Sequence, residues 1–226
     1  MTPNIFVYWD YDDCLGQTRK QFVQILLERY GHVVKTDDYL TPANTDGLLA
    51  PILDSAEFMR STPLDHTVLR VMQFLCDLRP DVKHGLATHR GYHPKGAEYT
   101  QELLERNGVT FDSYHYIDPV PYRDKMKYLR ELHKPEDIVI LVDDNTYYDH
   151  DAYPNSITVL IDKPWNKHVV TAHPELRVTP EGVYHCLQSV LDHIEQYKGV
   201  PDGRETQCED ISRLGPSFYV VGAGVV

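Results

Sequence analysis

The chain has 226 residues, of which 42% are hydrophobic, and this size fits one medium domain with a modest insertion. Its 22 Lys and Arg residues against 34 Asp and Glu residues give a formal net charge of −12. An acidic surface of this kind repels a phosphate backbone, so we expect no long nucleic acid as a partner. No stretch approaches the roughly 18 consecutive apolar residues of a membrane span, so we expect no membrane partner.

The cysteines and the N-terminal residues indicate in which cellular compartment the protein is expected. The four cysteines lie far apart and form no CxxC pair, which disfavours a structural zinc site and a disulfide framework. The N-terminal residues show no basic region followed by an apolar core, so no signal peptide is predicted. Together these features favour reduced thiols and a cytoplasmic location.

The first elements follow one another closely. Ile5–Trp9 is a short apolar run that predicts a buried strand ending at Asp10. Apolar residues then recur at helical spacing over residues 17–30, and Gly31 ends that helix. Residues 36–63 have weak periodicity and are punctuated by Pro and Gly, which predicts an irregular, partly helical insertion.

The rest of the chain alternates between helical and strand patterns. An amphipathic helix is predicted over residues 65–78, and a strand over residues 83–88 that ends in Ala87-Thr88. The later elements are a helix over 96–107, a helix over 124–133 with Asp124 as its N-cap, strands over 138–142 and 156–161, and a closing helix over 180–197. This alternation predicts an α/β fold with a doubly wound, Rossmann-like parallel sheet.

Polar residues with complementary chemistry follow three of the predicted strands. They are Asp10 and Asp12 after the first, Thr88 after the second, and Asp143 and Asp144 after the third. Ligands of parallel α/β sheets bind beyond the carboxyl ends of the strands, so these side chains are expected to meet. Gathered carboxylates repel one another unless a hard cation sits among them, and Mg²⁺ prefers such oxygen ligands.

The same residues suggest phosphoryl chemistry. A cation would keep Asp10 ionised as a nucleophile, and Asp12 lies where a turn can aim it at a leaving-group oxygen as general acid. Thr88 and a lysine would hold the non-bridging oxygens of the phosphate. Lys125, at the start of a predicted helix, is our choice for that lysine. Lys127 is the rival, and spacing alone does not decide between them.

These motifs resemble the four ordered motifs of the haloacid-dehalogenase superfamily. They are Asp10-x-Asp12-x-Cys14-Leu15, Ala87-Thr88, a helix-initial lysine, and Leu141-Val142-Asp143-Asp144. The resemblance covers roughly residues 5–165. It implies that Asp10 forms an aspartyl-phosphate and that Asp12 acts as acid and base. It also implies that Mg²⁺ is bound by Asp10, by Asp12 through its carbonyl, and by Asp143 and Asp144.

Two positions depart from the family pattern. Asp13 stands where glycine is usual, and Cys14 stands where threonine or valine is usual. Asp13 is either a further metal-site carboxylate or, as we favour, a solvated or turn-stabilising side chain. A cysteine-phosphatase interpretation of Cys14 fails because Lys20, not an arginine, lies six residues further on.

A narrower resemblance points to the substrate. Residues 57–64 and residues 160–166 are similar to segments of the 5′(3′)-deoxyribonucleotidase family. This resemblance implies a small helical cap inserted after the first strand, over residues 17–63. The core is then formed by residues 1–16 and 64–198, and residues 199–226 form a C-terminal extension. Small caps often leave subunit contacts to help, so a homodimer is expected.

The substrate-contacting residues are less well defined than the catalytic ones. Tyr11, Phe58 and Trp165 are aromatic candidates for stacking on a base, although Trp165 fits a core position equally well. The polar candidates are Arg60, His89 and Arg90. A structural ion pair is an equal alternative for Arg60.

The combined prediction is a Mg²⁺-dependent hydrolase, a phosphomonoesterase that acts on nucleoside monophosphates, preferably deoxy, through an aspartyl-phosphate. One alternative keeps the chemistry and changes the substrate to a sugar phosphate, a phosphorylated cofactor or a nucleic-acid 3′-phosphate end. Another is a binding module that has kept the fold and lost turnover.

Overall fold

A computed structural model describes residues 3–146, 153–170 and 176–198. Its centre is a six-stranded parallel sheet with strand order β3-β2-β1-β4-β5-β6. The strands are β1 (Ile5–Trp9), β2 (Lys83–Thr88), β3 (Ser113–Tyr116), β4 (Ile138–Asp143), β5 (Ser156–Ile161) and β6 (Arg177–Val178). The predicted doubly wound α/β fold is confirmed. The sequence patterns missed β3 and β6, the two short edge strands.

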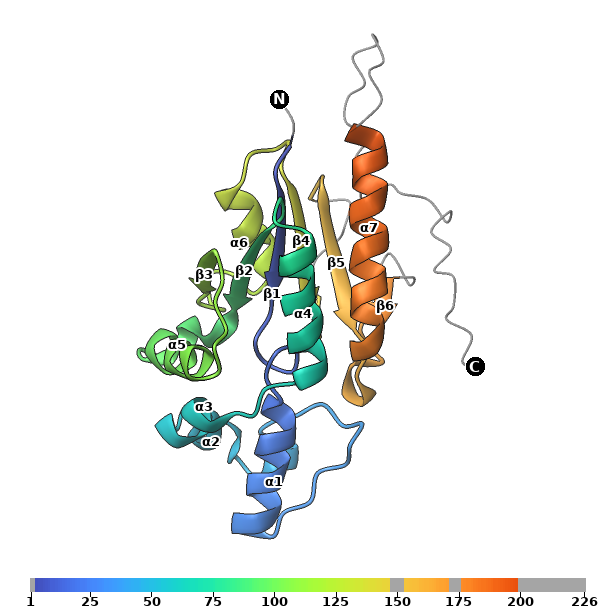
Figure 1. The fold of residues 1–226 in the computed structure, drawn as a ribbon. Helices are drawn as coiled ribbons and strands as arrows, with labels where there is room; N and C mark the ends of the chain where they lie inside the picture. The colour runs from blue at the N-terminus through green and yellow to red at the C-terminus, as the bar shows by residue number, and fades with distance from the viewer. Residues whose placement is uncertain (1–2, 147–152, 171–175, 199–226) are drawn as a thin grey trace.

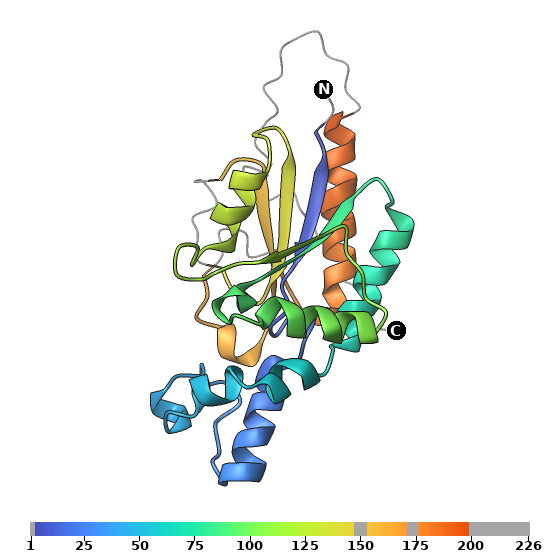
Figure 2. The same ribbon diagram turned by 90° about the vertical axis from the view of Figure 1, so that its left-hand side faces the viewer.

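Helices cover both faces of the sheet (Figures 1 and 2). On one face lie α4 (His66–Leu78) and α7 (Val183–Lys198), and on the other lies α6 (Lys125–Leu132). The helix α5 (Gly96–Arg106) packs beside the cap. Asp65 and Asp124 are N-caps whose carboxylates accept backbone N–H groups at the starts of α4 and α6, which satisfies donors that the helix leaves free.

The strands bury side chains on both faces, so two apolar clusters form. In β4, Ile138, Ile140 and Val142 pack with α4 and α7, whereas Val139 and Leu141 pack with α6. This alternation follows from the two-residue period of a strand. It also explains why the central strands read as continuous apolar runs in the sequence.

Residues between β1 and α4 form a separate small body at the carboxyl ends of the strands (Figure 1). It contains α1 (Thr18–Tyr30), a single 3₁₀ turn (Ala43–Thr45), α2 (Leu49–Leu53) and α3 (Ala56–Ser61). Phe22, Leu26, Val34, Ile52 and Phe58 form its own apolar cluster. Gly31 ends α1 in the left-handed conformation, with φ of 65°. We call this body the cap.

Among the described residues, no helix has the length and apolar character needed to cross a membrane. The C-terminal extension predicted over residues 199–226 lies outside the described residues.

Candidate active site

The three polar strand ends lie side by side because β2, β1 and β4 are neighbours in the sheet. Trp9 is in register with Leu86 of β2 and with Val142 of β4. The N–H of Asp10 continues the ladder by donating to the carbonyl of Val142 at 2.9 Å. Asp10, Thr88 and Asp143 therefore emerge at one edge of the sheet, beneath the cap.

Lys125 links the two central carboxylates. Its Nζ lies 2.7 Å from Oδ1 of Asp10 and 2.8 Å from Oδ2 of Asp143, and all three side chains are buried. The carboxylates raise the pKa of Lys125 in spite of burial, which acts in the opposite direction, so the ammonium stays charged. Lys127, in contrast, places its Nζ 5.9 Å from the ring centre of Tyr122 and does not line the cavity described below.

Asp10, Asp143 and Asp144 form a group whose carboxylate oxygens lie within 4.8 Å of one another. Burial raises the pKa of Asp10 well above its ordinary value, and Lys125 opposes this shift. Burial likewise raises the pKa of Asp144, with further contributions from the charges of Asp13 and Asp143. One lysine faces three carboxylates, so a divalent cation fits this oxygen-rich group by its charge and its ligand preference.

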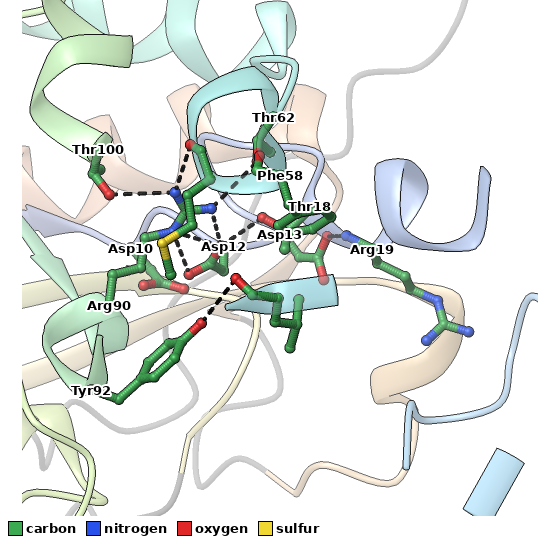
Figure 3. A network of polar contacts seen from close by, with 12 residues as sticks. Asp10, Asp12, Asp13, Thr18, Arg19, Phe58, Thr62, Arg90, Tyr92 and Thr100 are labelled. Carbon is green, nitrogen blue, oxygen red and sulfur yellow. Dashed lines mark hydrogen bonds and ion pairs between the residues drawn. The ribbon is translucent and has the colours of Figure 1, made fainter. Parts of the chain in front are cut away.

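The Asp12 carboxylate lines the same cavity but is not one of these three clustered carboxylates. It accepts hydrogen bonds from Arg90, from Nη2 at 2.7 Å and from Nε at 3.1 Å, and from the hydroxyl of Thr18 at 2.6 Å (Figure 3). Burial would raise the pKa of Asp12, but the charge and hydrogen bonds of Arg90 outweigh it and hold the pKa below its usual value. Metal binding by the Asp12 carbonyl remains a prediction.

Thr88 is fully buried, and its Oγ1 has no hydrogen-bond partner among the described residues. A buried hydroxyl without a partner is costly, and an oxygen of a ligand bound at this strand end would satisfy it. The next residue, His89, lines the cavity, and its Nε2 lies 2.9 Å from the carbonyl of Tyr122. Burial, followed by the charge of Lys125, lowers the pKa of His89 to about 4, so this imidazole is neutral at physiological pH.

A cavity of about 360 Å³ opens above the acidic group, between the core and the cap. The core supplies the charged part of its lining, including Asp10, Lys125 and Asp143. The cap supplies an apolar part, formed by Phe22, Leu40, Leu49 and Leu53. The cavity therefore has one polar end and one apolar wall.

The predicted aromatic contacts have different locations. Trp165 lines the cavity, and its Nε1 donates to Oδ2 of Asp144 at 3.4 Å. The guanidinium carbon of Arg19 lies over the Trp165 ring, 4.7 Å from the ring centre. Phe58 is not among the lining residues, because it packs edge-on against Phe22 inside the cap. Tyr11 is fully buried beneath the guanidinium of Arg90.

Arg60 also lies outside the cavity lining. Its Nε donates to Oε2 of Glu102 at 2.8 Å, and its guanidinium lies 4.2 Å from the ring centre of Tyr99. These partners belong to α5, so Arg60 joins the cap to the core. The structure thus contains the ion pair that was the alternative interpretation of this residue.

Asp13 and Cys14, the two departures from the motifs that the sequence resembles, both make contacts with the backbone. Asp13 adopts a positive φ of 58°, and its carboxylate accepts the N–H of Arg19 at 2.7 Å at the start of α1. Asp13 thereby stabilises the turn, although burial raises its pKa to about 7. Cys14 is fully buried, its thiol donates to the carbonyl of Val142 at 3.6 Å, and burial raises the pKa of the thiol well above the ordinary value, which disfavours the thiolate.

Sequence reasoning missed the pairing of Arg90 with Asp12 and the position of Thr18 and Arg19 in the cavity wall. No local pattern announces these contacts, because residues 12 and 90 are joined only by the fold. A threonine and an arginine at the first positions of a helix are equally typical of an ordinary solvated helix start.

No family model and no curated protein matches the chain in sequence. Solved structures resemble it in fold. A haloacid dehalogenase-like family hydrolase from Streptococcus pneumoniae aligns with 85% of this chain and 99% of its own, with 12% identity and a TM-score of 0.53. A haloacid dehalogenase-like family hydrolase from Xanthomonas campestris aligns with 87% and 100%, with 12% identity and a TM-score of 0.52.

A candidate beta-phosphoglucomutase from Thermotoga maritima aligns with 82% of this chain and 99% of its own, with 20% identity and a TM-score of 0.50. At these identities the likeness establishes the fold. The chain therefore has the α/β fold of haloacid dehalogenase-like hydrolases, with an acidic group at the carboxyl ends of its central strands.

Proposed function

We propose that the protein is a Mg²⁺-dependent phosphomonoesterase that hydrolyses nucleoside monophosphates to a nucleoside and inorganic phosphate. The observation that carries this proposal is the arrangement of Asp10, Lys125 and Asp143, joined by contacts of 2.7 and 2.8 Å at the polar end of the cavity. The unpartnered hydroxyl of Thr88 at the neighbouring strand end supports it.

The reaction proceeds in two displacements. In the first, a carboxylate oxygen of Asp10 attacks phosphorus, the bond from phosphorus to the leaving-group oxygen breaks, and Asp12 gives that oxygen its proton. This step requires the protonated form of Asp12 when substrate is bound, against the effect of Arg90, which lowers the pKa of Asp12. In the second, a water molecule attacks the phosphorus of the aspartyl-phosphate and loses its proton to Asp12. The bond to Asp10 then breaks, and inorganic phosphate is released.

The remaining polar residues act on the phosphate oxygens. Lys125 places a permanent positive charge next to Asp10, where negative charge accumulates during transfer. The Thr88 hydroxyl is a neutral donor for a non-bridging oxygen. Asp10, Asp143 and Asp144 would hold Mg²⁺, which offsets the charge of the carboxylates and of the phosphate when bound.

A nucleoside as leaving group fits the division of the cavity. A base needs an apolar or aromatic surface, and Trp165 and the cap residues Leu40 and Leu49 line the cavity with the acidic group. The volume of about 360 Å³ lies in the range of small-molecule sites. Residues 57–64 and 160–166 resemble segments of the deoxyribonucleotidase family, and this resemblance also favours a nucleotide as substrate.

The test is phosphate release from a panel of deoxy- and ribonucleoside monophosphates and sugar phosphates, with Mg²⁺ and with EDTA. We expect turnover of nucleotides that needs Mg²⁺ and is abolished in Asp10→Asn. Asp77→Asn, which changes an exposed carboxylate on α4, is the matched control and should retain activity.

Each part of the proposal has its own contrary outcome. Full activity in Asp10→Asn would overturn the mechanism. Turnover of sugar phosphates with no turnover of any nucleotide would overturn the substrate class and leave the mechanism standing. A wild-type protein that binds phosphate esters without turnover would mean that the fold serves as a binding module.

A further inference from the structure

The two chain segments that connect the cap to the core run side by side. Gly16 pairs with Leu64 in an antiparallel bridge, and the N–H of Gln17 donates to the carbonyl of Pro63 at 2.7 Å. A Cβ at Gly16 would lie 2.6 Å from the ring of Tyr11, so glycine at this position leaves room for that buried ring. These paired linkers are the place where any change in cap position must be absorbed.

Cap residues next to both linkers reach the Asp12 carboxylate. Thr18, the first residue of α1, donates to it from its hydroxyl at 2.6 Å. At the other end of the cap the contact is made through Arg90, whose Nη2 lies 3.5 Å from Oγ1 of Thr62 (Figure 3). Its Nη1 lies 3.4 Å from the carbonyl of Met59 in α3. The same guanidinium donates three hydrogen bonds to Asp12.

Arg90 itself is held firmly by the core. It is 2% exposed, its guanidinium carbon lies 4.0 Å from the ring centre of Tyr11, and its Nη1 donates to the hydroxyl of Thr100 at 3.3 Å. A Cβ at Gly96 would lie 1.9 Å from the Arg90 carbonyl oxygen, so a side chain at residue 96 is excluded there. A fixed, planar, multidentate donor of this kind is suited to orienting a carboxylate.

From these contacts we propose that Arg90 is a positioning residue that ties the orientation of the Asp12 carboxylate to the placement of the cap. When the cap linkers are seated, Thr18 and Arg90 hold Asp12 from two sides. When the linkers move, the bond from Thr18 to Asp12 and the contacts of Arg90 to Thr62 and Met59 are lost, and Asp12 is then held from the Arg90 side alone. This inference rests on the proposed function, because it assigns Arg90 a part in setting the acid of that reaction.

The test compares two leaving groups. Dinitrophenolate departs without a proton, whereas a nucleoside alkoxide needs one, so a misplaced acid penalises the nucleotide selectively. The ratio kcat/KM reports steps up to and including departure of the leaving group, and it is measured with Mg²⁺ for wild type and Arg90→Lys. Arg130→Lys is the matched control, since Arg130 also donates to backbone carbonyls but lies at the opposite edge of the sheet, before β4.

We expect Arg90→Lys to lower kcat/KM for the nucleotide at least ~10-fold more than kcat/KM for dinitrophenyl phosphate. This difference is a fraction of the roughly 10²–10⁴-fold acceleration that a general acid supplies. Guanidinium ion added to Arg90→Ala should restore part of the nucleotide activity. Equal losses for the two substrates, or no rescue by guanidinium, would overturn the proposal.

A second variant keeps the test valid where the Arg90 variants do not fold. Thr18→Val removes the hydrogen bond from the start of α1 to Asp12, and we expect the same selective loss with the nucleotide. An equal loss with both substrates would contradict the inference. The proposed function is tested separately, by Asp10→Asn with dinitrophenyl phosphate. If wild type hydrolyses dinitrophenyl phosphate and Asp10→Asn does not, the proposed function stands. If the Arg90 and Thr18 variants then lose kcat/KM equally for both substrates, only the positioning role is rejected.

Discussion

The ammonium of Lys125 lies 2.7 Å from the carboxylate of Asp10, although 115 positions separate them in the chain. The contact exists because β1 and β4 are neighbours and α6, which begins at Lys125, leads into β4. The pair places a buried positive charge next to the proposed nucleophile. Its removal should therefore affect catalysis more than any other change in α6.

We expect Lys125→Met to lower kcat by roughly 10²–10³-fold, the loss typical of removing one preorganised charge or donor from a transition state. Lys127→Met is the control, since Lys127 lies on the same helix but outside the cavity, and its kcat should stay at the wild-type value. Steady-state kinetics of both variants decides the matter. A larger loss in the Lys127 variant would contradict the assignment.

Metal binding can be measured without turnover. We expect Mg²⁺ to raise the melting temperature of the wild-type protein, because a ligand at 100 times its Kd stabilises the folded state by about 2.7 kcal/mol. Asp144→Asn should lose most of this response, and Asp77→Asn should keep it. Thermal unfolding with a Mg²⁺ series, and with EDTA, gives the answer. A wild-type melting temperature that does not respond to Mg²⁺ contradicts the metal site.

Thr88→Val separates stability from function. Valine has nearly the same shape, and the buried hydroxyl that it removes has no partner among the described residues, so the melting temperature should stay the same or rise. The activity should nevertheless fall, by about 10–10²-fold if the hydroxyl donates to a phosphate oxygen.

A buried threonine of the cap provides the contrast. Thr45 is fully buried, and its hydroxyl donates to the carbonyl of Thr41 at 2.7 Å. Thr45→Val should destabilise the protein by about 1 kcal/mol, the usual net value of one hydrogen bond. A Thr88→Val variant that is destabilised to the same degree and fully active would show that the Thr88 hydroxyl is structural.

Acid stability depends in part on Asp137. Its carboxylate accepts hydrogen bonds from the backbone and side-chain N–H groups of Asn4 and from the N–H of Lys134. Burial would raise its pKa, but these bonds outweigh it and lower the pKa below the ordinary value. Because the folded-state pKa is the lower one, this stabilisation is complete above the unfolded pKa of about 3.9 and is lost as the pH falls through the folded-state pKa.

Asp137→Asn should therefore lower the free energy of unfolding by about 1–3 kcal/mol at neutral pH, the range for losing hydrogen bonds to a charged group. The difference from wild type should shrink as the pH falls below about 4. Urea unfolding at several pH values measures it. A difference that is constant with pH would mean that the charge of Asp137 does not contribute.

Much of the fold was predictable because its determinants are local. Continuous apolar runs gave the central strands, and the residues that follow them, such as Asp10, Thr88 and Asp143, identified the functional edge of the sheet. The edge strands were missed because Ser113–Tyr116 and Arg177–Val178 are short and only partly buried, so they carry no strong apolar signal.

The sequence by itself determined the place of Asp10 at the end of a buried strand, and its role as nucleophile stays a prediction. Only the tertiary structure decided its partners. Residues 125 and 127 lie about 200° apart around a helix, so packing alone turns Lys125 toward Asp10 and Lys127 away. The same holds for Asp12, Arg90 and the cap linkers, whose contacts join distant segments and leave no trace in local sequence.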